Sequence, residues 1–251
     1  MLGLWRVAQN APQRQVGIWV NAGLFVLFFS LVGARLFYVG MNWPYFAAHP
    51  LEAIMVWSGG LTWPGAVAGA GLALIFMGFQ YRASRNRLPP HTAHLPLGWL
   101  GDRLYPLLPP LVITAWLGSW QSGVAYGAPL PTGTVLGIST LDESGAFSQR
   151  FPLQPLAALT LLAFFWLLEM RVKPLRPVGR LSGIATAGLL LHLLAASLLR
   201  ADPAPYWHGL RMDGWFALFS LIFFFTLIML NSLVLRNGRR PALSDPERSS
   251  T

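Results

Sequence analysis

The chain has 251 residues, of which 54% are hydrophobic and only 11% are charged, and its mean hydropathy is +0.50. A soluble domain of this length carries about 25% charged residues, so the composition excludes a soluble globular protein and indicates an integral membrane protein. Cysteine is absent, which excludes disulfides, thiolate metal sites, a cysteine nucleophile and a lipid-modified cysteine.

The net charge is +9, from 18 basic and 9 acidic residues, and Lys173 is the only lysine. The arginines gather in short clusters at the ends of apolar runs, which is typical of the cytoplasmic face of a membrane protein. A surface that binds nucleic acid is not indicated, so no nucleic-acid partner is expected.

Residues 1–15 lack the order of charged and apolar segments that marks a secretory signal, so the first apolar run is expected to be retained. The third apolar run contains Pro106, Pro109 and Pro110, and we expect its helix to pack centrally, where neighbours satisfy the freed carbonyls. Six runs predict membrane-spanning helices: 16–39, 61–81, 104–121, 156–170, 181–199 and 215–235.

The arginine clusters predict how these helices are oriented. Arg6 and Arg14 precede the first run, and basic segments at 82–87, 171–180 and 236–240 follow the second, fourth and sixth. With six spans all four clusters fall on one side, which the positive-inside rule makes cytoplasmic, together with both termini. The prediction is an all-α, polytopic transmembrane helix bundle, with one domain at 1–240 and a disordered polar tail at 241–251.

Three segments, 40–60, 122–153 and 200–214, are consequently expected outside. Arginines there run against the charge bias, and guanidinium groups at headgroup level suit bidentate contact with phosphate. The polar side chains of these segments that could take part in binding or catalysis are His49, Glu52, Asp142, Glu143, Arg150, Asp202, His208, Arg211 and Asp213.

Polar residues inside the apolar runs have two interpretations each. Arg35 either snorkels to the headgroups or meets a phosphate or carboxylate within the bundle. His192 either makes a hydrogen bond between helices or relays protons. The remaining histidines are scattered, and the pair His91 and His94 lies in a proline-rich loop, so no metal site is predicted.

The segment "GARLFYVGMNWPYFAAHPLEAIMVWSGGL" resembles the prolipoprotein diacylglyceryl transferase family, in which G-x-R-x-x-Y-V is followed by H-P-L-E and W-x-G-G-L. The similarity continues in order through "GDRLYP", "SGVAYG", "RFPLQP", "LLRADP" and "GLRMDGWFAL", from residue 33 to residue 218. The resemblance implies a protein of the bacterial inner membrane that needs no cofactor. It would move a diacylglyceryl group from phosphatidylglycerol to a lipobox cysteine.

The implied reaction suggests roles for individual residues. In the implied reaction a thiol loses its proton and attacks a glycerol carbon while glycerol phosphate departs, which requires a base and cations. The candidate bases are His49 and His208. The candidate phospholipid-binding residues are Arg35, Arg150, Arg200, Tyr126 and Gln154, and the architectural ones are Glu52, Gly59, Gly60, Asp102, Gly127 and Asp202.

The chain departs from the family pattern at two chemical positions. The family's H-G-G is occupied by Pro64-Gly65-Ala66, and its G-R-x-G-N signature reads Gly118-Ser119-Trp120-Gln121. The family's first helix, with its R-W-Y-G motif, has no counterpart either. Since proline accepts no proton and serine cannot replace a guanidinium, transfer is expected to be altered or lost.

Three functions stay open. The first is phosphatidylglycerol binding at the outer membrane boundary without ordinary transfer, and the second is an active but divergent transferase. The third is a non-catalytic subunit of a larger membrane complex. The partners implied are a phospholipid, and prolipoprotein signal peptides or subunits of such a complex. A transporter or channel is disfavoured, because no inverted repeat or acidic residue at mid-membrane is present.

Overall fold

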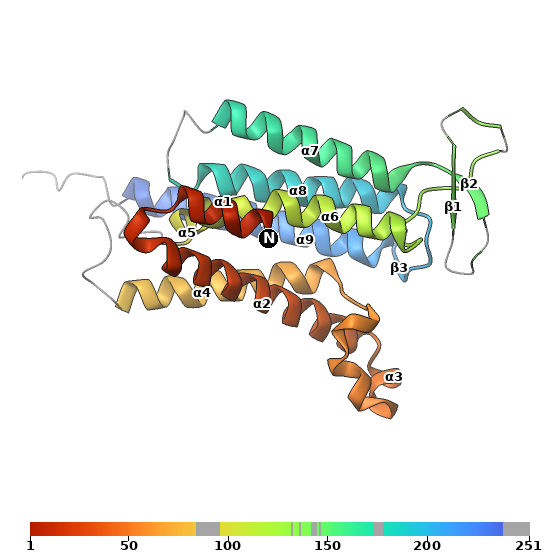
Figure 1. Cartoon of the computed structure of the whole chain (residues 1–251), viewed down its shortest axis with the longest axis horizontal. Coiled ribbons are helices and arrows are strands. Elements are labelled where there is room, and N and C mark those ends of the chain that lie inside the picture. The colour runs from red at the N-terminus through yellow and green to blue at the C-terminus, as the bar shows by residue number, and fades with distance from the viewer. Residues whose placement is uncertain are drawn as a thin grey trace, which may run out of the picture.

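The computed structural model describes residues 1–83, 96–131, 133–135, 137–141, 145, 147–172 and 178–237. Long helices lie side by side along one axis (Figure 1), which confirms the predicted all-α, polytopic architecture. The helices are α1 (Leu2–Asn10), α2 (Val16–Met41), α3 (Trp43–Ala48), α4 (Trp63–Ala83), α5 (Pro96–Leu104), α6 (Leu108–Gln121), α7 (Leu153–Val172), α8 (Arg180–Leu199) and α9 (Met212–Asn237). The predicted tail at 241–251 and the pair His91 and His94 lie outside the described residues.

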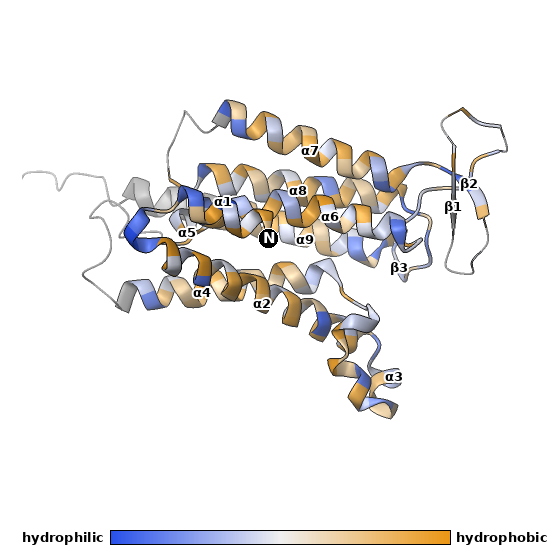
Figure 2. Ribbon diagram, in the orientation of Figure 1, coloured by the Kyte–Doolittle hydropathy of each residue, from blue (hydrophilic) through white to orange (hydrophobic). Residues whose placement is uncertain are grey.

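Four helices in the described part of the chain are long and apolar enough to cross a membrane: Gln13–Met41, Trp63–Tyr81, Leu153–Arg171 and Arg180–Leu199. Most of their residues are hydrophobic, as the ribbon coloured by hydropathy shows (Figure 2). Two of the six predicted spans do not meet this criterion of length and hydropathy among the described residues. The third run is divided by a buried 3-10 turn at Tyr105–Leu107, because its prolines remove backbone donors, and this leaves α6 with 14 residues. In α9 the apolar stretch among the described residues is Met212–Leu227.

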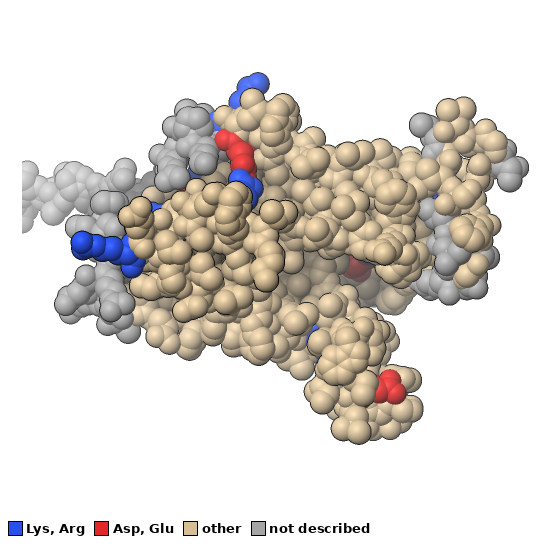
Figure 3. All heavy atoms as spheres, in the orientation of Figure 1, with Lys and Arg blue, Asp and Glu red and all other residues tan. Residues whose placement is uncertain are grey.

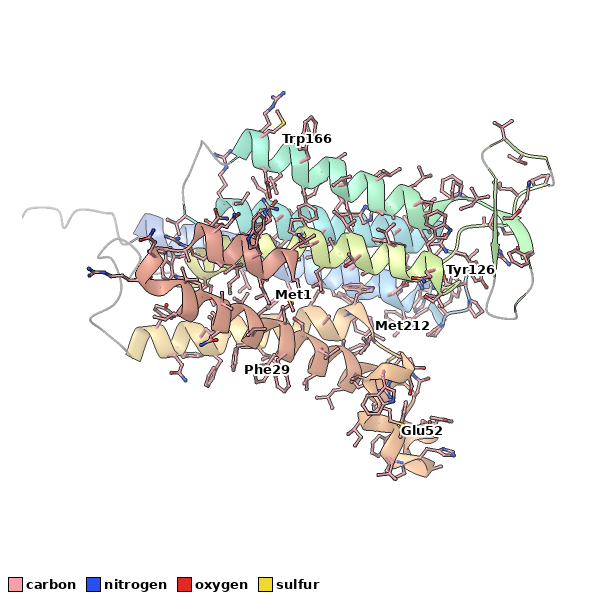
Figure 4. All side chains as sticks on the ribbon, viewed as in Figure 1. Met1, Phe29, Glu52, Tyr126, Trp166 and Met212 are labelled. Carbon is pink, nitrogen blue, oxygen red and sulfur yellow. The ribbon has the colours of Figure 1, made fainter. Side chains whose placement is uncertain are left out.

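The N-terminal segment forms a helix that the sequence did not predict. Helix α1 begins about midway along the bundle, where Met1 is labelled in Figure 4, and leads to the turn before α2. Its Val7 is 1% exposed, and Gly3 packs against the backbone of Leu107. Arg6 donates to both carboxylate oxygens of Glu169 on α7, at 2.6 and 2.7 Å. Helix α1 is therefore part of the packed bundle.

Helices α2 and α4 approach each other at glycines. A Cβ atom on Gly65 would lie 2.2 Å from the carbonyl oxygen of Gly33, and one on Gly69 would lie 2.1 Å from that of Phe29. Small residues four apart allow helix backbones to pack directly in a membrane, where no hydrophobic effect drives association. This contact holds the α2–α4 hairpin together.

We expect Gly69→Ala to lower the free energy of unfolding by about 1–3 kcal/mol, because the added methyl must push the two helices apart. Gly71→Ala on the same helix is the matched control, since a Cβ there meets no atom within 4 Å. The measurement is thermal unfolding in detergent micelles, followed by tryptophan fluorescence. Equal melting temperatures for the two variants would show that the contact carries no energy.

Asp102 on α5 fixes the beginning of α8. Its carboxylate accepts hydrogen bonds from the backbone N–H of Gly179 at 2.6 Å and of Ser182 at 2.8 Å, and from the Ser182 hydroxyl at 2.9 Å. These N–H groups have no partner within the helix, so the side chain acts as a cap supplied by a neighbouring helix. The cap sets the position of α8 along the bundle.

The described residues of the three segments that were expected outside lie together at one end of the bundle, which we call the outer end after that expectation (Figure 1). The outer end carries α3 and two short β-hairpins, which the sequence pattern did not predict. Strands β1 (Ile138–Leu141) and β2 (Phe147–Arg150) pair antiparallel with Ile138 opposite Arg150, and β3 (Tyr206–Trp207) pairs with β4 (Leu210–Arg211).

Candidate functional site

Residues 42–60 project from the outer end as an arm made of α3 and two 3-10 turns, Pro50–Ile54 and Val56–Ser58 (Figure 1). Arg35 of α2 holds the base of this arm and is 6% exposed. Its Nε donates to the carbonyl of Ala53 at 2.9 Å, its Nη1 to that of Gly59 at 2.6 Å, and its Nη2 to that of Glu52. The guanidinium therefore supplies hydrogen-bond donors to backbone carbonyls of the irregular arm, where no regular helix supplies them.

This geometry gives Arg35 a structural task that the sequence did not reveal. Contact of Arg35 with a lipid phosphate stays a prediction. Two of the three glycines predicted to be architectural have positive φ angles, +86° at Gly59 and +68° at Gly60. A Cβ at Gly60 would lie 2.4 Å from the Tyr38 ring and 2.7 Å from Arg35 Nη1, so only glycine fits there.

The arm has a small polar cluster on its surface. The Tyr45 hydroxyl donates to Glu52 Oε2 at 2.7 Å, and this hydrogen bond raises the pKa of Tyr45 above its ordinary value. The His49 ring stacks on Tyr45 with centroids 4.7 Å apart, and its Nδ1 lies 3.1 Å from the Tyr45 carbonyl oxygen. His49, a candidate base, is thus exposed on the arm.

Four charged residues form a cluster between the end of α8 and the start of α9, which we call the ion-pair cluster. Arg200 donates through Nε to Asp202 Oδ1 at 2.8 Å, through Nη2 to Asp202 Oδ2, and through Nη1 to Asp213 Oδ2 at 3.0 Å. Arg211 donates through Nη2 to Asp202 Oδ2 at 3.2 Å and through Nε to Asp213 Oδ1 at 3.3 Å. Two guanidinium groups and two carboxylates therefore neutralise each other.

The two halves of the ion-pair cluster differ in burial. The side chains of Arg211 and Asp202 are 3% and 6% exposed, whereas those of Arg200 and Asp213 are 20% and 19% exposed. Burial alone would raise the pKa of Asp202, but the hydrogen bond and charge of Arg200 and the charge of Arg211 outweigh it and hold this pKa below its ordinary value. Asp202 is consequently a buried carboxylate that stays ionised.

The loop after α6 joins the ion-pair cluster to the β1–β2 hairpin. The carbonyl of Tyr126 accepts from the N–H of Ala201 at 2.9 Å, and Gly127 forms an antiparallel bridge with Arg200. The Arg150 guanidinium lies 4.0 Å from the centre of the Tyr126 ring, and its Nε donates to the Ser148 hydroxyl. The structure thus brings three candidate lipid-binding residues, Tyr126, Arg150 and Arg200, to one region.

Gln154, the fifth candidate lipid-binding residue, is fully buried at the start of α7. Its Nε2 donates to the carbonyl of Val124 at 3.0 Å, and no donor among the described residues reaches its Oε1. The amide ties α7 to the loop that carries Tyr126. Gln154 therefore fixes that loop against the start of α7.

An open, apolar pocket of about 450 Å³ adjoins the ion-pair cluster. The space-filling view shows a hollow between the arm and the rest of the outer end, with an acidic side chain visible at its floor (Figure 3). Glu52 and Tyr126 lie on opposite sides of this region and Met212 between them (Figure 4). The pocket is lined by Met41, Pro205, Tyr206, Trp207 and Met212.

The other residues considered in the sequence, His208, Pro64 and Ser119, do not form a single site. His208, the second candidate base, is exposed in the β3–β4 turn with a φ of +47°, and its ring contacts Trp207. Pro64 is in the first turn of α4, and the Ser119 hydroxyl donates to the carbonyl of Ala115 within its own helix. The four charges of the ion-pair cluster lie in one short segment of the sequence, but their pairing was not predicted from it.

The fold and the outer end define a polytopic helical membrane protein in which the ion-pair cluster adjoins an apolar pocket. A model of the prolipoprotein diacylglyceryl transferase family matches residues 1–230. The chain therefore belongs to this family of membrane enzymes, as its motifs predicted.

Relatives named phosphatidylglycerol–prolipoprotein diacylglyceryl transferase match parts of the chain. The one from Lactococcus lactis subsp. cremoris is 35% identical over 86 residues, 32% of this chain and 31% of that protein. The one from Nitrosomonas europaea is 26% identical over 195 residues, 75% of this chain and 63% of that protein. The one from Parasynechococcus marenigrum is 27% identical over 219 residues, 81% of this chain and 73% of that protein. The chain thus spans about a third of the length of the Lactococcus relative.

Proposed function

We propose that this protein binds phosphatidylglycerol at the outer boundary of the bacterial inner membrane, and that its transfer of diacylglyceryl to prolipoprotein is altered or lost. The lipid is taken from the names of the relatives. The binding region is the ion-pair cluster with the adjoining apolar pocket. The ion-pair cluster would meet the headgroup, and the pocket would take the beginning of an acyl chain.

The observation that carries this proposal is that the arginines of the outer end already have partners within the chain. Arg35 donates to backbone carbonyls, Arg150 contacts Tyr126 and Ser148, and Arg200 and Arg211 pair with two aspartates. A cation that must stabilise a departing phosphate in the transition state works best when it is preorganised for that charge. Here two of the arginines meet carboxylates instead, which favours binding over rapid transfer.

The two altered family positions support the same conclusion. Pro64 offers no proton acceptor in its side chain, and Ser119 directs its hydroxyl to its own helix. The candidate bases that remain, His49 and His208, are exposed on the arm and on a hairpin turn respectively. A base must lie within hydrogen-bond reach of the thiol that it deprotonates. The ring contacts described for His49 and His208 are to Tyr45 and Trp207, outside the ion-pair cluster.

The test is a binding and transfer assay with purified protein in phosphatidylglycerol liposomes and a lipobox peptide. We expect Arg200→Gln to weaken phosphatidylglycerol binding about tenfold or more, because hydrogen bonds to charged groups contribute about 1.5–3 kcal/mol. Arg14→Ala, an exposed arginine before α2, is the control and should bind as the wild type does. Mass spectrometry of the peptide should show no diacylglyceryl adduct with either protein.

A diacylglyceryl adduct that forms with the wild type and vanishes in Arg200→Gln would instead establish the active, divergent transferase. One observation favours that alternative, since Arg200 keeps 20% of its side chain exposed. His49 and His208 would then be replaced in turn to find the base. Absence of both adduct and lipid binding would favour the third function, an accessory subunit of a membrane complex.

A further inference from the structure

The ion-pair cluster contains one carboxylate in an unusual position for a site that receives a phosphate. Asp213 Oδ1 is held by three donors: the Ser197 hydroxyl at 2.9 Å, the N–H of Gly214 at 3.0 Å and Arg211 Nε at 3.3 Å. Its other oxygen, Oδ2, accepts from Nη1 of Arg200 at 3.0 Å. Asp213 is therefore fixed by one oxygen and presents the second to Arg200.

Arg200 and Asp213 are also the partly exposed members of the ion-pair cluster, at 20% and 19% for their side chains, while Asp202 and Arg211 are buried. An incoming headgroup consequently meets one guanidinium and one carboxylate. The carboxylate neutralises Arg200 and repels a phosphate that approaches it. A guanidinium has five N–H donors, and the bond to Asp213 occupies one of those that would otherwise pair with phosphate oxygens.

We propose that Asp213 is a specificity-determining residue that weakens the binding of anionic headgroups by competing with them for Arg200. This inference rests on the proposed binding of phosphatidylglycerol at the ion-pair cluster. With both aspartates the cluster has no net charge, and without the charge of Asp213 it is a cation. Asp213 thereby reduces the preference for an anionic lipid over a zwitterionic one.

The test compares variants of the purified protein in detergent micelles, titrated with short-chain phosphatidylglycerol and, separately, with short-chain phosphatidylcholine. Bound lipid is measured by native mass spectrometry. Asp213→Asn keeps an oxygen for Ser197 and Gly214 but removes the charge. We expect it to bind phosphatidylglycerol about threefold or more tightly than the wild type, as expected for release of a partly exposed ion pair, with phosphatidylcholine binding unchanged.

Asp213→Glu keeps the charge and should bind phosphatidylglycerol no more tightly than the wild type. Asp213→Ala tests the same loss of charge if the asparagine variant does not fold. A folded, neutral variant that binds phosphatidylglycerol no better than the wild type would overturn the inference. If Arg200→Gln binds this lipid as well as the wild type, the proposed function itself fails. If Arg200→Gln loses the lipid and Asp213→Asn gains none, only the role of Asp213 fails.

Discussion

Replacing Asp202 with alanine is expected to lower the free energy of unfolding by about 3–5 kcal/mol, the cost of removing one partner from a buried ion pair. Asp202 is 5% exposed and accepts from both Arg200 and Arg211. Without it, Arg211 would be a buried cation with Asp213 as its remaining carboxylate partner among the contacts described above. Thermal unfolding in detergent micelles measures the effect.

The control is a double variant, Asp202→Leu with Arg211→Met, which removes both buried charges. It should regain part of the lost stability, because apolar residues of similar volume often replace a buried ion pair without cost. A single variant as stable as the wild type would show that Asp202 does not hold the ion-pair cluster together.

Stability should also depend on pH through Asp202. Its pKa is lowered in the folded protein, so the folded state gains from ionisation of this carboxyl. The gain is fully present above the ordinary pKa of aspartate, about 3.9, and it is lost as the pH falls through the lowered folded value. The same melting experiment, repeated across acidic pH, should therefore show a smaller fall in the double variant.

Replacing Arg35 with glutamine is expected to release the arm from the bundle. The substitution removes charge-assisted hydrogen bonds to Glu52, Ala53 and Gly59, and two such bonds alone contribute about 3 kcal/mol or more. Lysine should restore little, since its single ammonium cannot reproduce the planar fork of a guanidinium. Hydrogen exchange of the backbone amides in the arm measures the release.

The β1–β2 hairpin is the internal control for this experiment, because none of the contacts of Arg35 described above reaches it. Exchange in Arg35→Gln should accelerate in residues 49–60 and stay unchanged in the hairpin. Equal acceleration in both would indicate general destabilisation, and no acceleration in either would show that other contacts hold the arm.

The amino-acid sequence by itself determined the class of protein and most of its helices. Apolar runs near 20 residues are long enough to cross a bilayer, and this signal is local, so that α2, α4, α7 and α8 were found close to their actual bounds. The four charge clusters grouped residues 40–60, 122–153 and 200–214 on one side, and the structure places these segments at one end. Ordered motifs over residues 33–218 identified the family.

Elements without a strong local signal in the sequence were not predicted. Helix α1 has nine residues and no apolar run, so its burial depends on contacts with α6 and α7 that its own sequence does not encode. The two-residue strands β3 and β4 are too short to produce an alternating pattern. The prolines of the third apolar run were recognised in the sequence, but it did not reveal by how many residues they shorten the helix.

Only the tertiary structure decided which charged groups meet. The pairing of Arg6 with Glu169 joins residues far apart in the chain, and the caps that Asp102 gives to α8 join α5 to a helix beyond the next two. The sequence left Arg35 a choice between the headgroups and a phosphate or carboxylate within the bundle, and the structure adds its hydrogen bonds to backbone carbonyls of the arm. The physical reason is that the sequence determines how many charged residues lie near a membrane boundary. Which of them pair depends on the packing that brings donor and acceptor atoms within about 3 Å of each other.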